Sequence, residues 1–415
     1  MCEIQSGLSG MKTLFFFCLG TLVYAWAGYL LLLAALSWCK GRREEKRSKS
    51  PFVTVLLTVR NEEQTIEGRM KNLLSLDYPA DRCEILVASD GSTDQTERIV
   101  EGMFQNGKLP GAIPKVRMIR VEAGGKSLAQ NRAIPHAKGE IIVLTDARSR
   151  FDRSAIKALV RHFGDRRTGC VSGRLMLRRD GSSIGESHCF YWRYEMLLRK
   201  LESRLGLLHT ASGMIMAFRK DLFRSFEARH GDDCVIPLDI AAMGYRVVHE
   251  ESAIVFDQFP TSMNGELEAR ARMTLRNIAG TFSRMHLLNP FRNPMLFAAV
   301  FSHKILRWLT PYFMLLLFAA NCFLLPEGRF YMGFFYMQTA FYCLGIIGYA
   351  AEKIRVRIPV AGQVFSFLLA NAGFFLGVLK AAGGRKVTSY RNTGESANAR
   401  GHKDADGLGA RNAQG

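Results

Sequence analysis

Two carboxylates of this chain follow apolar runs at the points where the runs end. Ile141–Thr145 has the composition of a strand buried on both faces, and Asp146 comes directly after it. Cys83–Ser89 leads in the same way into Asp90, just before a glycine turn. Ligands of an open α/β sheet bind outside the carboxyl ends of its strands. Asp146 is therefore predicted to face a polar ligand or a metal ion, or else to cap the next helix as ordinary turn chemistry. Asp90 is predicted to face the crevice, where it could accept hydrogen bonds from a ribose or a base.

A pair of adjacent carboxylates, Asp232 and Asp233, opens a predicted helix that continues to Met243. One carboxylate raises its neighbour's proton affinity, which suits a general base. The pair could equally cap the helix. By contrast, the spacing of Asp94 and Glu97 predicts a helix cap and a structural role for Asp94.

Polar side chains also gather where the first apolar run, Phe52–Val59, ends. They are Thr58, Arg60 and Glu62. They either contact a ligand or belong to an acid-rich helix start. Further along, Gly124 and Gly125 precede a helix that opens with Lys126, so backbone amides and a cation could face a phosphate. The spacing is not that of a Walker loop.

The elements that must position these residues alternate between apolar runs and helical patterns, which is typical of βαβ units on a mostly parallel sheet. The predicted strands are Phe52–Val59, Cys83–Ser89, Val116–Val121, Ile141–Thr145, Ser212–Phe218 and Gly244–Val248. The predicted helices end near Leu76, run from Tyr191 to Leu205, and run from Gly231 to Met243.

Four apolar segments are long enough to span a bilayer. They are Thr13–Cys39, Trp308–Pro326, Phe330–Ala351 and Ile358–Leu379. Basic residues from Lys40 onward place the following domain in the cytoplasm, and the mixed segment Asn289–Arg307 suits the membrane interface. Four spans put both termini outside, whereas Lys380, Arg385 and Lys386 favour the inside. The last segment is therefore predicted either to span the bilayer or to be re-entrant or surface-lying.

The net charge of +19 comes from 56 Lys and Arg against 37 Asp and Glu. Many of these basic residues lie beside the apolar segments, which indicates a membrane surface and argues against nucleic acid. Nine cysteines without a Cys-x-x-Cys pair predict neither a zinc site nor a disulfide framework. The predicted organisation is an anchor and basic linker at 1–49, an α/β domain at 50–260, interfacial amphipathic helices at 261–307, membrane helices at 308–385 and a disordered tail at 386–415.

In their order and spacing, these motifs resemble the family 2 glycosyltransferases, and most of all the membrane-bound, cellulose-synthase-like group. The resemblance covers about 51–307 and is carried by Asn61-Glu62, Asp90 to Asp94, Lys126 with Asn131, Asp146, Asp232-Asp233, Arg272 and Arg276. It implies a glycosyltransferase A-type nucleotide-sugar-binding domain with a mostly parallel central sheet, one membrane helix before it and about three after it.

The resemblance also implies roles for the candidate residues. Thr58, Arg60, Glu62 and Asp90 would hold the nucleoside, with Lys126 and Asp146 near the ribose and diphosphate. Arg272 and Arg276 would contact phosphate. Asp233, with Asp232 beside it, would be the general base. A divalent cation, Mg or Mn, would bind the diphosphate with Asp146 as a ligand.

The chain departs from the family pattern at two places. Asp-x-Asp is Asp146-Ala147-Arg148 here, so the second carboxylate, an expected metal ligand, is missing. Either the ion is held by Asp146, the diphosphate and water, or Arg148 neutralises part of the phosphate charge itself. The Gln-x-x-Arg-Trp of processive synthases corresponds to Met273–Asn277, which lacks the tryptophan on which a growing polymer would stack.

The predicted function is that of a membrane-anchored, inverting, hexosyltransferase-type enzyme of the cell inner membrane with a cytoplasmic catalytic domain. It would move sugar from a nucleotide donor, uridine-linked, to a lipid-linked or membrane-proximal glycan acceptor. One alternative is a processive polysaccharide synthase whose export channel needs partner membrane subunits. Another is a non-catalytic scaffold that binds nucleotide. The motifs make a common prediction, that Asp90, Asp146 and Asp233 converge on one site.

Overall fold

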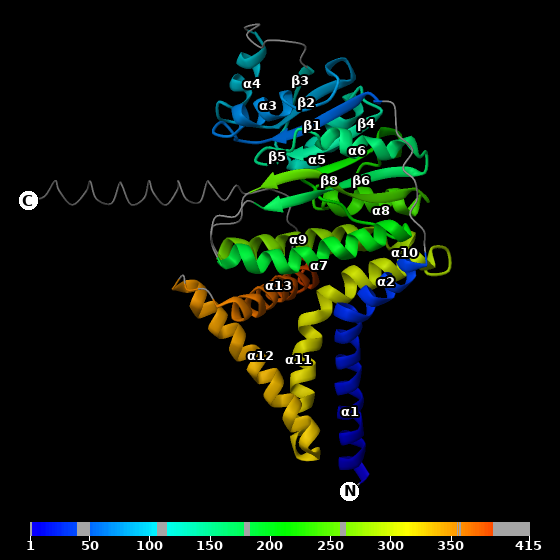
Figure 1. Ribbon diagram of the computed structural model, residues 1–415, viewed down its shortest axis with the longest axis vertical. Helices are drawn as coiled ribbons and strands as arrows, with labels where there is room; N and C mark the ends of the chain where they lie inside the picture. Colours follow the sequence, from blue (N-terminus) through cyan, green and yellow to red (C-terminus); the bar gives the residue numbers. More distant parts are fainter. Residues whose placement is uncertain are drawn as a thin grey trace, which may run out of the picture.

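The computed structural model describes residues 2–39, 50–105, 114–177, 183–257, 263–354, 356 and 358–384. The basic linker from Lys40 to Lys49 and the tail predicted to be disordered lie outside these residues. The described chain combines an α/β domain with a set of long apolar helices on one side of it (Figure 1).

The α/β domain is built on one sheet of eight strands in the order β3-β2-β1-β4-β7-β6-β8-β5. The strands are β1 (Val53–Val59), β2 (Cys83–Asp90), β3 (Lys115–Val121), β4 (Ile141–Asp146), β5 (Arg150–Phe151), β6 (Thr168–Leu177), β7 (Ile215–Arg219) and β8 (Arg246–Asp257). Strands β3, β2, β1 and β4 are parallel neighbours, as are β6 and β8, while β7 runs antiparallel between β4 and β6. This arrangement confirms the predicted mostly parallel sheet.

Helices cover both faces of the sheet, because its central strands are apolar on both sides. The helices of the domain are α3 (Ile66–Leu74), α4 (Thr96–Gln105), α5 (Lys126–Ala133), α6 (Ala155–Val160), α7 (Ser183–Leu205) and α8 (Asp232–Ala242). One apolar core packs α3, α4 and α6 against one face, and a second packs α5 and α8 against the other. Strand β1 contributes alternate residues to the two cores, which fixes the positions of the strand ends that carry the polar side chains.

Strand β6 was not predicted from the sequence. It contains Gly169 and Gly173, and its pairing with β8 has two register irregularities, so neither an apolar run nor a regular alternation marks it. A Cβ at Gly173 would lie 2.5 Å from the Ala253 carbonyl oxygen. The close approach of β8 therefore explains the glycine.

Four helical segments of the described chain are long and apolar enough to cross a membrane. They are Ser6–Trp38, Pro294–Glu327, Arg329–Lys353 and Pro359–Ala382. The first comprises α1 (Cys2–Val23), a π-helical turn η1 (Tyr24–Gly28) and α2 (Tyr29–Trp38); the second comprises α10 (Pro294–Val300), a π-helical turn η7 (Phe301–Ile305) and α11 (Leu306–Leu324). One N-terminal and three C-terminal helical segments were predicted, and this count is confirmed.

The four apolar segments are not equivalent in space. Helices α1 and α11 run side by side away from the domain and share an apolar cluster around Phe15, and α12 (Arg329–Lys353) runs obliquely beside them (Figure 1). The last helix, α13 (Pro359–Ala382), instead lies across the base of the domain, against α7 and α9 (Met263–Ser283). Gly373 and Gly377 make this approach close, since a Cβ there would lie 2.7 Å from Arg270 and 2.6 Å from Thr274.

Candidate active site

The predicted site residues lie where β1, β2 and β4 end and where α5 and α8 begin. Thr58 and Asp146 are paired in the register of β1 and β4, so their side chains belong to neighbouring strand ends. Helix α5 starts at Lys126, and helix α8 starts at Asp232. The fold thus gathers segments that are up to about 170 residues apart in the sequence at one edge of the sheet.

Lys126 occupies the centre of this site. Its Nζ lies 2.7 Å from Asp146 Oδ1 and 3.0 Å from Asp232 Oδ2, and it donates a longer hydrogen bond of 3.4 Å to the Gly213 carbonyl. Burial alone would lower the pKa of Lys126, but the two carboxylates raise it above its usual value. The ammonium therefore stays charged and links the end of β4 to the start of α8.

The two carboxylates of the acidic pair have different surroundings. Asp232 is buried, accepts a hydrogen bond from Gln130 Nε2 at 2.9 Å and pairs with Lys126. Among the described residues, the Asp233 carboxylate has no hydrogen bond or ion pair, although the Asp233 backbone carbonyl accepts a bond from Ala211. The N-cap of α8 is Gly231 and no side chain in the described part of the chain caps it, so the helix-cap interpretation of the pair is wrong.

Opposite pKa shifts follow from these surroundings. Burial by itself raises the pKa of Asp232, but Lys126 and Arg276 outweigh it and hold the pKa below its usual value. Burial and then the negative charge of Asp232 raise the pKa of Asp233. One carboxylate is thus kept ionised as a structural partner of Lys126, and the other has the higher proton affinity that a general base uses.

Asp90 lies at the same edge, but its carboxylate is turned into the protein. It is only 3% exposed and accepts hydrogen bonds from the backbone amides of Gly124, at 2.8 Å, and Gly125, at 2.9 Å. The expectation that these amides face a phosphate is therefore wrong, because the buried carboxylate needs them as donors. Asp90 fixes the turn from which Lys126 projects, and its predicted contact with the nucleoside stays a prediction.

Thr58 and Arg60 lie on either side of the β1 end. The Thr58 hydroxyl is a buried polar atom without a partner among the described residues. Arg60 Nη1 lies 3.7 Å from Asp90 Oδ2, and its side chain is 39% exposed. As predicted, Asp94 caps α4, since Asp94 Oδ1 accepts the Thr96 amide at 3.0 Å.

Arg272 and Arg276, the last two predicted site residues, lie one turn apart on α9. Arg276 Nη2 donates to Ser127 Oγ at 2.8 Å and to the His230 carbonyl at 2.7 Å, while its buried Nε has no partner among the described residues. Arg272 is half-buried on the same helix. Arg276 therefore ties α9 to the start of α5.

The Arg148 side chain is partly exposed, and its Nε binds Glu62. Arg148 Nε lies 3.1 Å from both oxygens of the Glu62 carboxylate, which also accepts a bond from Thr65 Oγ1 at 2.7 Å. Glu62 is only 8% exposed. Its predicted nucleoside contact stays a prediction, but the structure shows that both carboxylate oxygens already accept hydrogen bonds.

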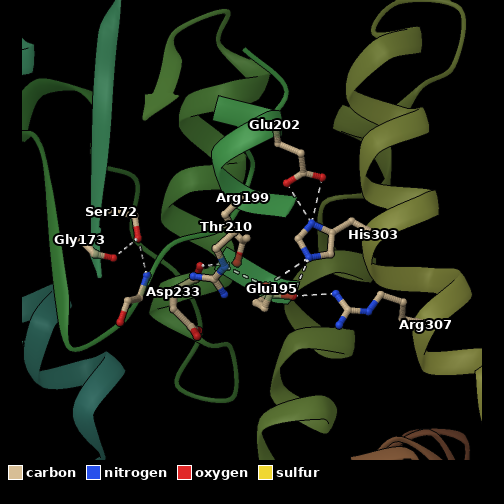
Figure 2. Close-up of polar contacts among 10 residues, drawn as sticks. Ser172, Gly173, Glu195, Arg199, Glu202, Thr210, Asp233, His303 and Arg307 are labelled. Atoms are coloured by element: carbon tan, nitrogen blue, oxygen red, sulfur yellow. Dashed lines mark hydrogen bonds and ion pairs between the residues drawn. The ribbon is translucent and has the colours of Figure 1, made fainter. Parts of the chain in front are cut away.

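A cluster of charged residues lies behind the site, between α7 and the apolar helices, and the sequence did not predict it. We call it the α7 ion cluster; its members are Glu195, Arg199, Glu202, His303 and Arg307. Figure 2 shows His303 and Arg307 reaching toward Glu195 and Glu202 on α7. The signal that could have revealed it is the presence of charged residues on a segment, Asn289–Arg307, that is otherwise apolar.

The chain is similar in sequence to known family models and proteins. The family model "Glycosyl transferase family 2" matches residues 54–226, and "Glycosyl transferase family group 2" matches residues 141–348, half of the chain. Poly-beta-1,6-N-acetyl-D-glucosamine synthase of Staphylococcus aureus is 26% identical over 228 residues, which are 53% of each chain, and the Staphylococcus epidermidis protein of that name is 25% identical over 229. The chain spans about half the length of these curated relatives.

Among solved structures, the fold is similar to that of a mannosyltransferase from Pyrobaculum calidifontis, whose structure was determined in complex with GDP-Man and Mn2+. The TM-score is 0.69 at 22% sequence identity, over 90% of this chain and 99% of the other. This likeness confirms the predicted fold. The family model that matches half of the chain shows that the chain belongs to the family 2 glycosyltransferases.

Proposed function

We propose that this enzyme transfers a sugar with inversion from a nucleotide-sugar donor, uridine-linked, to a lipid-linked or glycan acceptor at the inner membrane, in cell-envelope glycan synthesis. The observation that carries the proposal is the Asp233 carboxylate, which has a raised pKa and no partner among the described residues. Beside it, Lys126 forms ion pairs with Asp232 and Asp146, and this charged group can face a diphosphate.

In the proposed reaction, Asp233 takes the proton of the acceptor hydroxyl. The hydroxyl oxygen attacks the anomeric carbon from the face opposite the diphosphate, the new carbon–oxygen bond forms, and the bond to the diphosphate breaks. The leaving diphosphate keeps the electron pair. Lys126 and the guanidinium of Arg276 are the cations that would stabilise its charge.

The predicted divalent cation has few protein ligands available. Asp146 would supply one oxygen, but the expected second carboxylate is Arg148, and Asp146 already holds the ammonium of Lys126 at 2.7 Å. In the described part of the chain, no three His, Cys, Asp or Glu side chains are grouped as a metal site. These residues do not build a metal centre, and we assign no step to an ion.

The membrane part of the proposal follows from the position of α13. If α1, α11 and α12 cross the bilayer and α13 lies along its surface, the start of α1 is outside and the end of α13 is on the side of the α/β domain. Lys380 is then cytoplasmic, as its charge favours. Contact of α13 with α9, which carries Arg272 and Arg276, would bring a membrane-embedded acceptor close to the site.

A screen of nucleotide sugars tests the proposal. The detergent-solubilised full chain is incubated with UDP-, GDP- and dTDP-linked sugars, with and without membrane lipid extract, and the released nucleotide is measured. We expect release from one donor class, increased by the lipid extract. If none of the donors is turned over under any condition, the proposal is contradicted.

A processive polysaccharide synthase is the second candidate, and the sequence similarity to poly-beta-1,6-N-acetyl-D-glucosamine synthases favours it. Three apolar segments after the domain are few for an export channel, so this candidate calls for partner membrane subunits. The tryptophan expected at Asn277 is absent. Product length separates the candidates: a single added sugar supports the first, and polymer supports the second.

The raised pKa of Asp233 predicts the acid limb of the pH–rate profile. The base must be ionised, so the rate should fall as the pH drops through the pKa of Asp233. Because burial and Asp232 raise this pKa, the limb should lie above the usual aspartate value of 3.8. The measurement is kcat against pH at saturating donor. Removing the neighbouring charge with Asp232→Asn should move the limb to lower pH; an unmoved limb would contradict the assignment.

Replacing Lys126 with methionine should weaken donor binding by about tenfold or more, since a charge-assisted contact is lost and two carboxylates are left facing the diphosphate. The Kd of the preferred donor would be measured by calorimetry. Lys157→Met is the control, because Lys157 forms an exposed ion pair with Asp77 on another part of the domain. Equal affinities of Lys126→Met and wild type would remove Lys126 from the donor site.

A further inference from the structure

Arg148 is held in one orientation by the loops at the sheet edge. Its Nε contacts both oxygens of Glu62 at 3.1 Å, and Glu62 is itself fixed by its backbone amide, which donates to Thr96 Oγ1 at 2.7 Å. The Glu62 carboxylate also accepts the Thr65 hydroxyl. A flexible side chain that follows β4 by two residues is therefore anchored over the ends of β1 and β4.

The anchor uses only one of the three guanidinium nitrogens. Among the described residues, neither terminal nitrogen of Arg148 has a hydrogen-bond partner, and the side chain is 48% exposed. An arginine presents its donors in a planar fork that matches two phosphate oxygens. The Glu62 contact thus leaves this fork accessible at the edge of the sheet where ligands bind.

The neighbouring carboxylate is already neutralised. Lys126 Nζ lies between Asp146 and Asp232, at 2.7 and 3.0 Å, where a cation bound to Asp146 would meet another positive charge. A divalent ion prefers several oxygen ligands, and the motif here supplies Asp146 together with a guanidinium in place of the second carboxylate. The side chains present therefore do not fit a metal centre. They fit a pair of cations, Lys126 and Arg148, in its place.

We propose that Arg148, oriented by Glu62, binds the diphosphate of the nucleotide donor and, with Lys126, replaces the divalent cation, so that donor binding does not require a metal ion. The inference rests on the proposed function, since it needs a nucleotide diphosphate at this site. It assigns Glu62 the role of a positioning residue for Arg148. Neutralisation of the leaving diphosphate then comes from two fixed side-chain charges.

The test is calorimetric binding of UDP, GDP and dTDP to the detergent-solubilised full chain, in EDTA and in manganese chloride. For the nucleotide that binds, the wild-type affinity should differ by less than about threefold between the two conditions. Arg148→Ala should lose about tenfold or more in EDTA. Arg148→Asp, which restores two carboxylates to the motif, should bind only when manganese is present.

Arg161→Ala is the matched control. Arg161 is 45% exposed and forms an ion pair with Glu250 away from the site, so its variant should bind nucleotide as the wild type does. Glu62→Gln keeps the shape of the anchor but weakens it, and should lie between wild type and Arg148→Ala in EDTA.

The outcomes separate this inference from the proposed function. Wild-type binding that is lost in EDTA and restored by manganese, together with an Arg148→Ala variant that behaves like the wild type, overturns the inference and leaves the glycosyltransferase assignment of the site intact. Absence of binding for all three nucleotides in both conditions overturns the proposed donor site, and the inference with it.

Discussion

The variant Asp233→Asn is expected to transfer sugar about 10²–10⁴ times more slowly than the wild type, the range that general-base catalysis contributes. The amide has nearly the shape of the carboxylate but cannot take the acceptor's proton. The Asp233 carboxylate has no partner among the described residues, so the variant breaks no hydrogen bond or ion pair with them. The measurement is kcat with saturating donor and acceptor.

Donor affinity provides the internal control for this variant. Lys126 contacts Asp146 and Asp232 and makes no ion pair with Asp233, so Asp233→Asn should bind the nucleotide with an affinity close to that of the wild type. Asp221→Asn, at an exposed aspartate elsewhere on the domain, should leave both kcat and affinity unchanged. Asp233→Asn with a kcat equal to that of the wild type would show that another group accepts the proton.

The variant Glu202→Ala is expected to lower the free energy of unfolding by about 3–5 kcal/mol, because it removes one partner from a buried ion cluster. Glu202 is fully buried and accepts hydrogen bonds from the Tyr29 hydroxyl and from His303 Nδ1, both at 2.9 Å. Burial alone raises the pKa of Glu202, but His303 holds it below its usual value. Loss of the carboxylate leaves two buried polar groups without their acceptor.

Denaturation of the detergent-solubilised protein measures this effect. The control is Glu251→Ala, which breaks the partly exposed pair with Lys200 and should cost less than about 1 kcal/mol. The comparison also tests how the domain is joined to the membrane helices, because Tyr29 belongs to α2 and His303 to η7, whereas Glu202 belongs to α7. Equal stabilities of the two variants would show that the α7 ion cluster does not hold α7 to these helices.

The sequence by itself determined which elements exist and where most of them end. Strands β1, β2, β3 and β4 were predicted to within one or two residues, and β1, β2 and β4 are largely apolar or β-branched runs with a polar residue at or just after the end. The four apolar segments were predicted for the same reason: length and lack of charge are local properties of the chain. The motif order also sufficed to indicate the family.

The tertiary structure decided how the charged groups are paired. The motif resemblance singled out Asp233, but only the position of Lys126 makes Asp232 an ion-pair partner and leaves the Asp233 carboxylate without one among the described residues. Likewise, Asp90 is satisfied by amides 34 and 35 residues away, and Glu62 by Arg148, 86 residues away.

The place of the last apolar helix was also a tertiary result. Composition makes α13 equivalent to a membrane span, but Gly373 and Gly377 allow it to pack along α9 at the base of the domain. Strand β6 escaped prediction because its irregular pairing with β8 hides its periodicity. Hydrophobic runs act through neighbours in sequence, whereas ion pairs and close helix contacts join distant segments, and their partners are set only when the chain has packed.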